Sequence, residues 1–418
     1  MDNKLGDFFR LSFGNILEWY DFSLYMYFIE MIRQHFFPLN NVYFSTLATL
    51  ATFAAGSIVR PVGGVLAGWL SDLYSPRKIV NICVIAMGIT TFLIALLPDY
   101  SMIGWVAPML LVTLRLIQGL SVGGQMPGLI TLSANEHTQQ RGFAVSLIFT
   151  VSSLGFLLAS FVGWAMSYWQ GVIPDTIRWR LPFALSGVLF MIYLYLNRGQ
   201  QRLIPAKPSD KSSKKIVSAL LKQWPAIMAV VALTTMCASL YYLTFTYLMA
   251  YQVAYLGVAK QTAAWLNMMA LALACVLYPI AGKFVDRFGS LWVFILTAGS
   301  LFVLAIPLIA MLKLSISLIS LIVLFIMTII MAFMQATVSP LFAMAFEQEW
   351  RTTGCAFSYG VGNGLAGSAP LVAALILHWL PHWGLAFLIM GLILLGIVGM
   401  VLIYKKSTEL KNKPTIVV

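Results

Sequence analysis

The sequence predicts an all-α protein that crosses a membrane many times, with twelve transmembrane helices arranged as two pseudo-symmetric six-helix bundles. Hydrophobic residues make up 60% of the chain and charged residues only 10%, whereas a soluble domain carries about 25% charged residues. Apolar runs of about 20 residues recur along the sequence, and each is long enough to cross about 30 Å of hydrocarbon as a helix. A polar, basic stretch divides these runs into six and six.

Charged residues, proline and glycine bound the apolar runs and so place the predicted helices. In the first half we expect helices at about 13–36, 43–70, 79–97, 105–134, 143–168 and 181–197. In the second half we expect them at about 224–255, 262–282, 291–311, 315–346, 354–378 and 384–404. The first run has no short apolar core followed by a small-residue cleavage site, which favours a retained helix over a removed signal peptide.

The same pattern predicts the domain organisation. We expect an N-terminal six-helix bundle at 1–197, a basic linker at 198–222, a C-terminal six-helix bundle at 223–404 and a tail at 405–418. Serine, proline and seven basic residues against one acid make the linker a poor helix former with a net charge of +6.

Basic residues also predict the orientation in the membrane. With both termini and the linker on one side, 19 of the 26 lysines and arginines lie on that side and 5 lie opposite. Because cytoplasmic loops carry the excess of basic residues, we expect both termini to be cytoplasmic in a multi-pass inner-membrane protein. This distribution accounts for the net charge of +12 without a nucleic-acid partner. The expected surroundings are the lipid bilayer, and the expected oligomeric state is the monomer.

The loop after the second helix of each half shows an internal repeat. Gly64-x-x-x-Gly68 precedes Asp72 and Arg77, and Gly282 precedes Asp286 and Arg287 at an offset of 214 residues between the two acids. Small residues let helices approach closely, and acids and bases at helix ends can pair differently in two conformations. We therefore expect a duplicated fold whose gates use Asp72, Arg77, Asp286 and Arg287.

Three acidic residues lie within an apolar run, where an ionised group is costly unless it is paired or hydrated: Glu18, Asp21 and Glu30. Glu18 and Asp21 are three residues apart and share one face of the first helix, which favours proton exchange by this pair. The alternative is that they solvate and cap the end of the helix. Glu30 lies close to Arg33 and is interpreted as part of a solvated helix end.

Two arginines lie within predicted helices, where a permanently charged guanidinium has to face a cavity or a carboxylate. Arg115, Gln118 and Gln125 share one face of the fourth helix at spacings of 3 and 7. Arg115 can either hold a substrate carboxylate or tune the two acids of helix 1. Arg60 precedes Pro61 and can either line the site or stabilise a kink.

Three local strings of the sequence are distinctive: GNILEWYDF from Gly14, RPVGG from Arg60 and RLIQGLSVGGQ from Arg115. The six-plus-six plan and the paired loop resemble the major facilitator superfamily. The three strings resemble its metabolite:proton symporters, which include citrate, 2-oxoglutarate, shikimate and proline/betaine carriers. The first loop copy departs from the superfamily pattern at Leu73, Ser75 and Pro76, and Gln125 stands where these symporters commonly carry Glu.

The resemblance implies a central cavity lined by helices 1, 4, 7 and 10 and a substrate held near the middle of the membrane. It extends the candidate substrate-binding set beyond Arg60, Arg115, Gln118 and Gln125 to Tyr241, Tyr242, Gln335, Tyr359 and Asn363. Arginines on one side and hydroxyls, amides and aromatic rings on the other suit a small anion or zwitterion. The Arg115-x-x-x-Gly119 pattern is similar to a superfamily motif associated with proton transfer.

The sequence therefore predicts a proton-coupled symporter that imports a small organic acid or zwitterionic metabolite by alternating access. No enzymatic activity, metal or cofactor is expected, because the sequence contains no phosphate-binding loop, no nucleophile motif and no histidines or cysteines at metal-ligand spacing; the coupling ion is the proton. Two alternatives stay open. One is an exporter or antiporter of the same superfamily, and the other is a non-transporting membrane sensor with this fold.

Overall fold

The computed structural model describes residues 10, 12–136, 139–169, 171–198, 222–381 and 383–411. Within these ranges only the backbone is described for residues 42, 43, 46, 72, 167, 254, 260, 349 and 406–411. The described residues form helices joined by short loops, and no β-strand occurs among them. The predicted all-α fold is confirmed.

The first half contains the helices α2 (Gly14–Tyr27), α3 (Ile29–Phe36), α4 (Val42–Ile58), α5 (Arg60–Leu73), α6 (Pro76–Ala95), α7 (Tyr100–Ile103), α8 (Val106–Glu136), α9 (Arg141–Tyr168), α10 (Asp175–Arg178) and α11 (Arg180–Leu196). Proline stands in the first turn of both α5 and α6. This position suits proline because its missing N–H would have no partner there.

The second half contains α13 (Trp224–Tyr242), the π-helical segment η1 (Leu243–Tyr247), α14 (Leu248–Leu256), α15 (Lys260–Phe288), α16 (Ser290–Leu312), α17 (Ser317–Met344), the 3₁₀ segment η2 (Gln348–Trp350), α18 (Arg351–Ala366), α19 (Ala369–Trp379) and α20 (Gly384–Lys411). Gly289 separates α15 from α16 with a φ of 85°, a backbone conformation that glycine adopts without steric cost.

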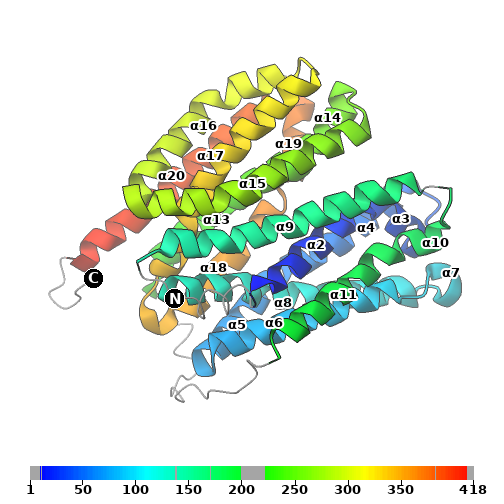
Figure 1. Cartoon of the computed structure of the whole chain (residues 1–418), viewed down its shortest axis with the longest axis horizontal. Helices are drawn as coiled ribbons and strands as arrows, with labels where there is room; N and C mark the ends of the chain where they lie inside the picture. The colour runs from blue at the N-terminus through cyan, green and yellow to red at the C-terminus, as the bar shows by residue number, and fades with distance from the viewer. Residues whose placement is uncertain are drawn as a thin grey trace.

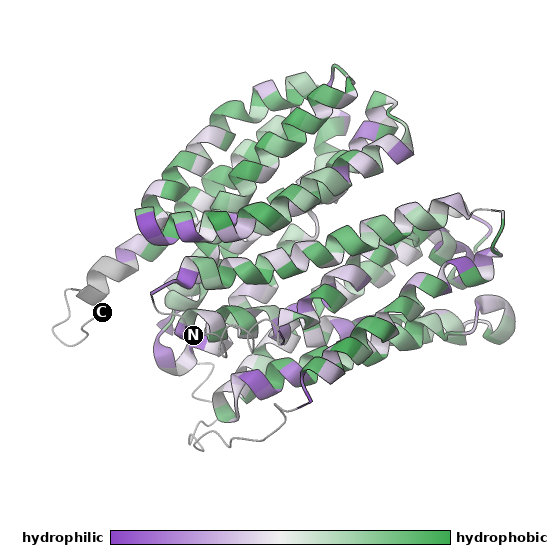
Figure 2. Cartoon of the chain, viewed as in Figure 1, coloured by the Kyte–Doolittle hydropathy of each residue, from purple (hydrophilic) through white to green (hydrophobic). Residues whose placement is uncertain are grey.

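Eleven helices of the described chain are long and apolar enough to cross a membrane. The predicted first span, 13–36, is divided at Phe28 into α2 and α3, and neither piece alone reaches the length of a bilayer. Counted as one membrane-crossing segment, this pair completes the predicted twelve. Hydropathy colouring shows apolar residues along the middle of the helices and hydrophilic residues gathered toward their ends (Figure 2), as expected for a multi-pass membrane protein.

The two halves form two bundles that lie side by side (Figure 1). Contacts between them come chiefly from α9 against α15 and from α5 against α18. We call the end of the molecule that carries the start of α2 and the end of α20 the terminal end. α9 and α15 also meet near the opposite end, where the ring centroids of Trp164 and Trp265 lie 5.9 Å apart.

Small residues allow the closest approach of the halves. A Cβ atom added to Gly68 of α5 would lie 2.7 Å from the Cα of Thr353 on α18, and one added to Gly142 of α9 would lie 2.7 Å from the carbonyl oxygen of Gly282 on α15. Both distances are shorter than any side chain tolerates, so these backbone contacts require glycine. The glycines of both repeated loops thus lie where helices of opposite halves meet.

The predicted domain boundaries stay a prediction, because residues 199–221 of the linker and 412–418 of the tail lie outside the described residues.

Candidate substrate and proton site

A polar cavity lies inside the first half, between α2, α4, α5, α6 and α8. About 330 Å³ of it is free of atoms, a volume that includes space open to solvent, and five of the predicted site residues line it: Glu18, Asp21, Arg60, Arg115 and Gln118. All five are at most 7% exposed. The structure therefore brings together the acids of helix 1 and both intramembrane arginines, which the sequence placed on three separate segments.

Within this cavity Asp21 and Arg115 form a buried ion pair. The guanidinium Nη1 of Arg115 donates a hydrogen bond of 2.7 Å to Asp21 Oδ2. The guanidinium also lies over the ring of Tyr25, 4.3 Å from its centroid, where a cation–π interaction adds to the pair. Arg115 is consequently held by two groups of its own half.

Glu18 and Arg60 form no such pair, although Asp21 Oδ1, Arg115 Nε and Arg115 Nη2 are also buried without a hydrogen-bond partner. Glu18 is 2% exposed, its Oε2 accepts no hydrogen bond, and it forms no ion pair within the described part of the chain. Arg60 begins α5 at the break that follows α4, lies over the ring of Phe22 at 5.4 Å, and has an Nε without a partner. Burial of such groups is costly unless a ligand or a proton compensates it.

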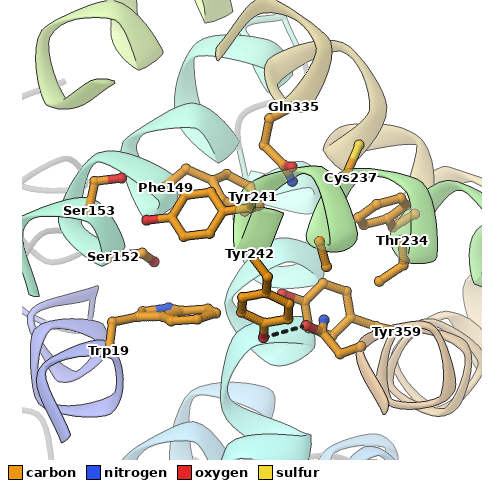
Figure 3. A pocket seen from close by; sticks show the side chains of 13 residues that line it. Trp19, Phe149, Ser152, Ser153, Thr234, Cys237, Tyr241, Tyr242, Gln335 and Tyr359 are labelled. Atoms are coloured by element: carbon orange, nitrogen blue, oxygen red, sulfur yellow. Dashed lines mark hydrogen bonds between the residues drawn. The ribbon is translucent and has the colours of Figure 1, made fainter. Parts of the chain in front are cut away.

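A second cavity, which we call the aromatic cavity, lies between the halves, and six of its thirteen lining residues are aromatic. About 440 Å³ of it is free of atoms, a volume that includes space open to solvent. All five predicted site residues of the second half line it: Tyr241, Tyr242, Gln335, Tyr359 and Asn363. Its remaining walls come from both halves and consist of Trp19, Phe149, Ser152, Ser153, Thr234, Cys237, Ala238 and Phe342 (Figure 3). None of these thirteen lining residues carries a charge.

The aromatic cavity holds hydrogen-bonding groups with unused capacity. The hydroxyl of Tyr242 donates a hydrogen bond of 3.3 Å to Asn363 Oδ1 (Figure 3), while Asn363 Nδ2 has no partner. Thr234 Oγ1 is likewise buried without a partner. Buried polar groups are nearly always satisfied in folded proteins, so these atoms suit contacts with a bound polar molecule.

The two cavities share a wall of aromatic rings. Phe22 of the first half stacks on Tyr242 of the second with ring centroids 5.6 Å apart, and Trp19 lies 6.1 Å from Tyr241. Tyr242 also lies within electrostatic reach of Arg60 and Glu18. A ligand in the aromatic cavity can therefore interact with the charged groups of the first half.

The predicted amides of helix 4 have different surroundings. Gln118 lines the polar cavity and donates a hydrogen bond of 2.8 Å to Thr91 Oγ1. Gln125 is fully buried, lines neither cavity, and donates a hydrogen bond of 3.0 Å to Asn15 Oδ1. Asn15 in turn contacts Ser152 of α9 at 3.3 Å. Gln125 therefore contributes to packing between α2, α8 and α9.

Among the predicted gate residues, Asp286 joins the two halves at the terminal end. Its carboxylate accepts hydrogen bonds from the backbone N–H groups of Gly142 at 2.7 Å and Phe143 at 2.8 Å. These N–H groups belong to the first turn of α9, where the helix dipole favours a negative charge. Asp286 thus caps a helix of the opposite half.

The other predicted gate residues make contacts within their own half, or cannot be placed. Arg77 pairs with Glu136 at 3.3 Å, and Arg287 lies over the ring of Phe288, 5.4 Å from its centroid. The side chain of Asp72 lies outside the described residues.

Sequence reasoning missed one contact between the halves and part of the aromatic cavity. Arg351 at the start of α18 donates a hydrogen bond of 2.5 Å to Asn135 Oδ1 at the end of α8. Trp19 follows Glu18 directly in the string GNILEWYDF. Its position next to a candidate site residue could have identified it as a cavity residue. Ser152 and Ser153 lie on an apolar helix whose sequence does not distinguish them from other buried serines.

Comparison with known proteins decides the family. The family model of the Major Facilitator Superfamily matches residues 11–369. The chain belongs to this superfamily. It is therefore a transport protein and not an enzyme, and the membership accounts for its two six-helix halves.

Curated relatives within the superfamily are bacterial metabolite carriers. The chain is 27% identical to the shikimate transporter of Escherichia coli K12 over 390 residues, which cover 88% of this chain and 87% of the relative. It is 29% identical to the alpha-ketoglutarate permease of the same organism, covering 87% and 85% of the two chains. A citrate-proton symporter of Klebsiella pneumoniae is 29% identical, with 70% and 67% covered. These likenesses confirm the predicted resemblance to metabolite:proton symporters.

Solved structures of the superfamily share the fold. The proton:xylose symporter XylE, bound to 6-bromo-6-deoxy-D-glucose, superposes with a TM-score of 0.74 at 17% identity, and the match covers 96% of this chain and 95% of that one. At this identity the likeness concerns the fold alone. Fold, relatives and apolar helices together make the protein a multi-pass inner-membrane transporter of a small molecule.

Proposed function

We propose that the protein imports a small organic acid or zwitterionic metabolite together with protons. The observation that carries this proposal is that two cavities adjoin across the stacked rings of Phe22 and Tyr242. One holds two buried acids and two arginines, and the other is uncharged and aromatic. The first supplies groups that exchange a proton and hold a carboxylate, and the second supplies a surface for the rest of the substrate.

Alternating access provides the transport cycle. The halves meet through Asp286 and the N-terminus of α9, and through Arg351 and Asn135, at the terminal end. With the terminal end in the cytoplasm, as the basic residues predict, this arrangement closes the site from the cytoplasm. Rocking of the two bundles would break these contacts and release the substrate inside. The proton is the proposed coupling ion, no cofactor takes part, and the proposed working unit is the monomer.

Reconstitution in liposomes tests this function. Purified protein is assayed with labelled shikimate, 2-oxoglutarate, citrate, proline and glycine betaine under an imposed pH gradient, acid outside. We expect accumulation of at least one compound that collapses when a protonophore is added, whereas protein-free liposomes accumulate none.

Other outcomes support the alternatives. Accumulation only under the reversed pH gradient would identify an antiporter. Binding of a compound without counterflow, in which unlabelled substrate trapped inside drives labelled substrate inward, would identify a sensor.

A further inference from the structure

Within the described chain, Arg60 and Glu18 are the two charged groups of the polar cavity that have no partner of opposite charge in contact. Asp21 and Arg115 neutralise one another across 2.7 Å, so that pair adds no net charge to the site. Arg60 and Glu18 influence one another electrostatically without forming an ion pair. What the site can bind is therefore determined by this second, separated pair.

Resting on the proposed function, we infer that Glu18 carries the coupling proton, that Arg60 holds the substrate carboxylate, and that transport is electroneutral with one proton per monocarboxylate. The empty cavity is neutral, because two acids balance two arginines. Protonation of Glu18 leaves one positive charge, and one carboxylate at Arg60 restores neutrality. On the other side the carboxylate leaves Arg60 and the proton leaves Glu18, which regenerates the empty site.

Neutrality explains how the two ligands are coupled. A site that carries only the proton has a net charge of +1, and one that carries only the anion has a net charge of −1. Moving either of these charged forms through a closed, low-dielectric state costs more free energy than moving a neutral site. The empty and the fully loaded forms are neutral, so these two forms reorient and the half-loaded forms do not.

Neighbouring groups leave this charge count unchanged. The titratable groups within reach of Glu18 are Asp21 on its own helix, Arg60 of α5, Arg115 of α8, Cys83 of α6, Tyr242 of α13 and Tyr359 of α18. Between Gly142 and Met166, α9 contributes only uncharged side chains, and the Tyr193 hydroxyl of α11 donates to Asn81. Tyrosine and thiol groups are neutral near pH 7, so the sum rests on two acids and two arginines.

The aromatic cavity selects the body of the substrate. None of its thirteen lining residues is charged, so a second carboxylate would lie there without a cation. Flat faces from Trp19, Tyr241 and Phe149 favour a ring or a compact apolar body. Neutral groups without partners, such as Asn363 Nδ2 and Thr234 Oγ1, accommodate hydroxyl or carbonyl oxygens. The favoured substrate is a cyclic monocarboxylate, and di- and tricarboxylates are disfavoured.

Uptake driven by a pH gradient and uptake driven by a membrane potential, measured separately, test the electroneutral stoichiometry independently of the proposed function. In proteoliposomes, an inward proton gradient of one pH unit should accumulate shikimate, used as the cyclic monocarboxylate probe, about tenfold, since one proton moves per molecule. A potassium diffusion potential without a pH gradient should accumulate none. Substrate addition to protein on a solid-supported membrane should give no steady transport current.

Variants test the two assigned residues. Glu18→Gln mimics the protonated state, so counterflow should persist, lose its pH dependence and fail to accumulate substrate under a pH gradient. Arg60→Gln should lose substrate binding, and Arg60→Lys should retain part of it because the charge is kept. Glu30→Gln, which neutralises an acid of the first span that lies outside both cavities and pairs with Arg33, is the matched control and should retain gradient-driven accumulation.

The results divide cleanly. Accumulation driven by membrane potential, uptake of citrate or 2-oxoglutarate in preference to shikimate, or pH-dependent accumulation by Glu18→Gln would overturn the charge count while transport itself stands. If the wild-type protein shows neither counterflow nor accumulation with any of the five compounds, the proposed function itself is overturned.

Discussion

Arg115 of α8 holds the carboxylate of Asp21 of α2 across 94 residues of sequence, with 2.7 Å between Nη1 and Oδ2. Both side chains are almost completely buried. The arginine that the sequence offered as a substrate anchor is thus already engaged by an acid of its own half. This pairing favours its other hypothetical role, tuning the acids of helix 1. Arg60 is the cavity arginine that has no acidic partner within the described chain, and both arginines keep donor atoms without a partner.

The first prediction concerns that ion pair. Asp21→Asn and Arg115→Gln should each lower the apparent unfolding temperature in detergent, because each leaves one buried charge without its partner, at a cost of about 3–5 kcal/mol. The double variant should be less destabilised than the sum of the two single variants. Strictly additive shifts would show that the pair contributes nothing as a unit.

Substrate affinity distinguishes the two roles of Arg115. If Arg115 anchors the substrate, Arg115→Lys should weaken substrate binding by about 1–3 kcal/mol, because lysine lacks the planar guanidinium that binds a carboxylate through two hydrogen bonds. Because we favour the tuning role, we expect Arg115→Lys to change the substrate affinity little and to shift the pH profile of transport. Binding isotherms at two pH values check this, and a large loss of affinity at both would restore the anchor role.

The second prediction concerns Asp286. Asp286→Ala removes two charge-assisted hydrogen bonds to the first turn of α9, each contributing about 1.5–3 kcal/mol. The closed terminal end should open more often, so a cysteine introduced at the buried Thr353 should react faster with a thiol reagent in a variant whose native cysteines are replaced. Arg287→Ala, at the neighbouring position, is the control. Equal rates in both variants would refute a gating role for Asp286.

The third prediction compares two glycines. Gly142→Ala would place a Cβ 2.7 Å from the Gly282 carbonyl oxygen and 2.8 Å from Asp286 Oδ1, so it should force the halves apart and slow transport. Gly299→Ala adds a methyl group with nothing within 4 Å and should raise thermal stability slightly, by about 0.5–1 kcal/mol. Initial rates of counterflow measure the first effect. Unimpaired transport by Gly142→Ala would show that the close contact is dispensable.

The fourth prediction concerns orientation. If both termini and the linker are cytoplasmic, a cysteine at Ser212 should resist an impermeant thiol reagent added to intact cells and react after the cells are opened. A cysteine at Val172, which is 80% exposed in the loop before α10, lies at the opposite end and should react in intact cells. Reaction of Ser212→Cys from outside would reverse the proposed topology.

Composition and periodicity were sufficient to predict the positions of the helices and to identify several candidate site residues. Runs of about 20 apolar residues cannot remain in water, so the spans followed from length alone. Within such a run each charge is costly and stands out, which is why the sequence alone identifies Glu18, Asp21, Arg60 and Arg115 as candidates. The break at Phe28 was not predicted, because an apolar run continues through it.

Only the tertiary structure decided which of these charges are paired. Helical periodicity indicates which residues share a face but not which neighbouring helix that face meets, and that choice depends on packing over the whole bundle. Asp21 therefore could not be assigned to Arg115, nor Asp286 to the backbone of α9, from spacing alone. The structure separates an ion pair, Asp21 with Arg115, from Glu18 and Arg60, which form no ion pair within the described chain.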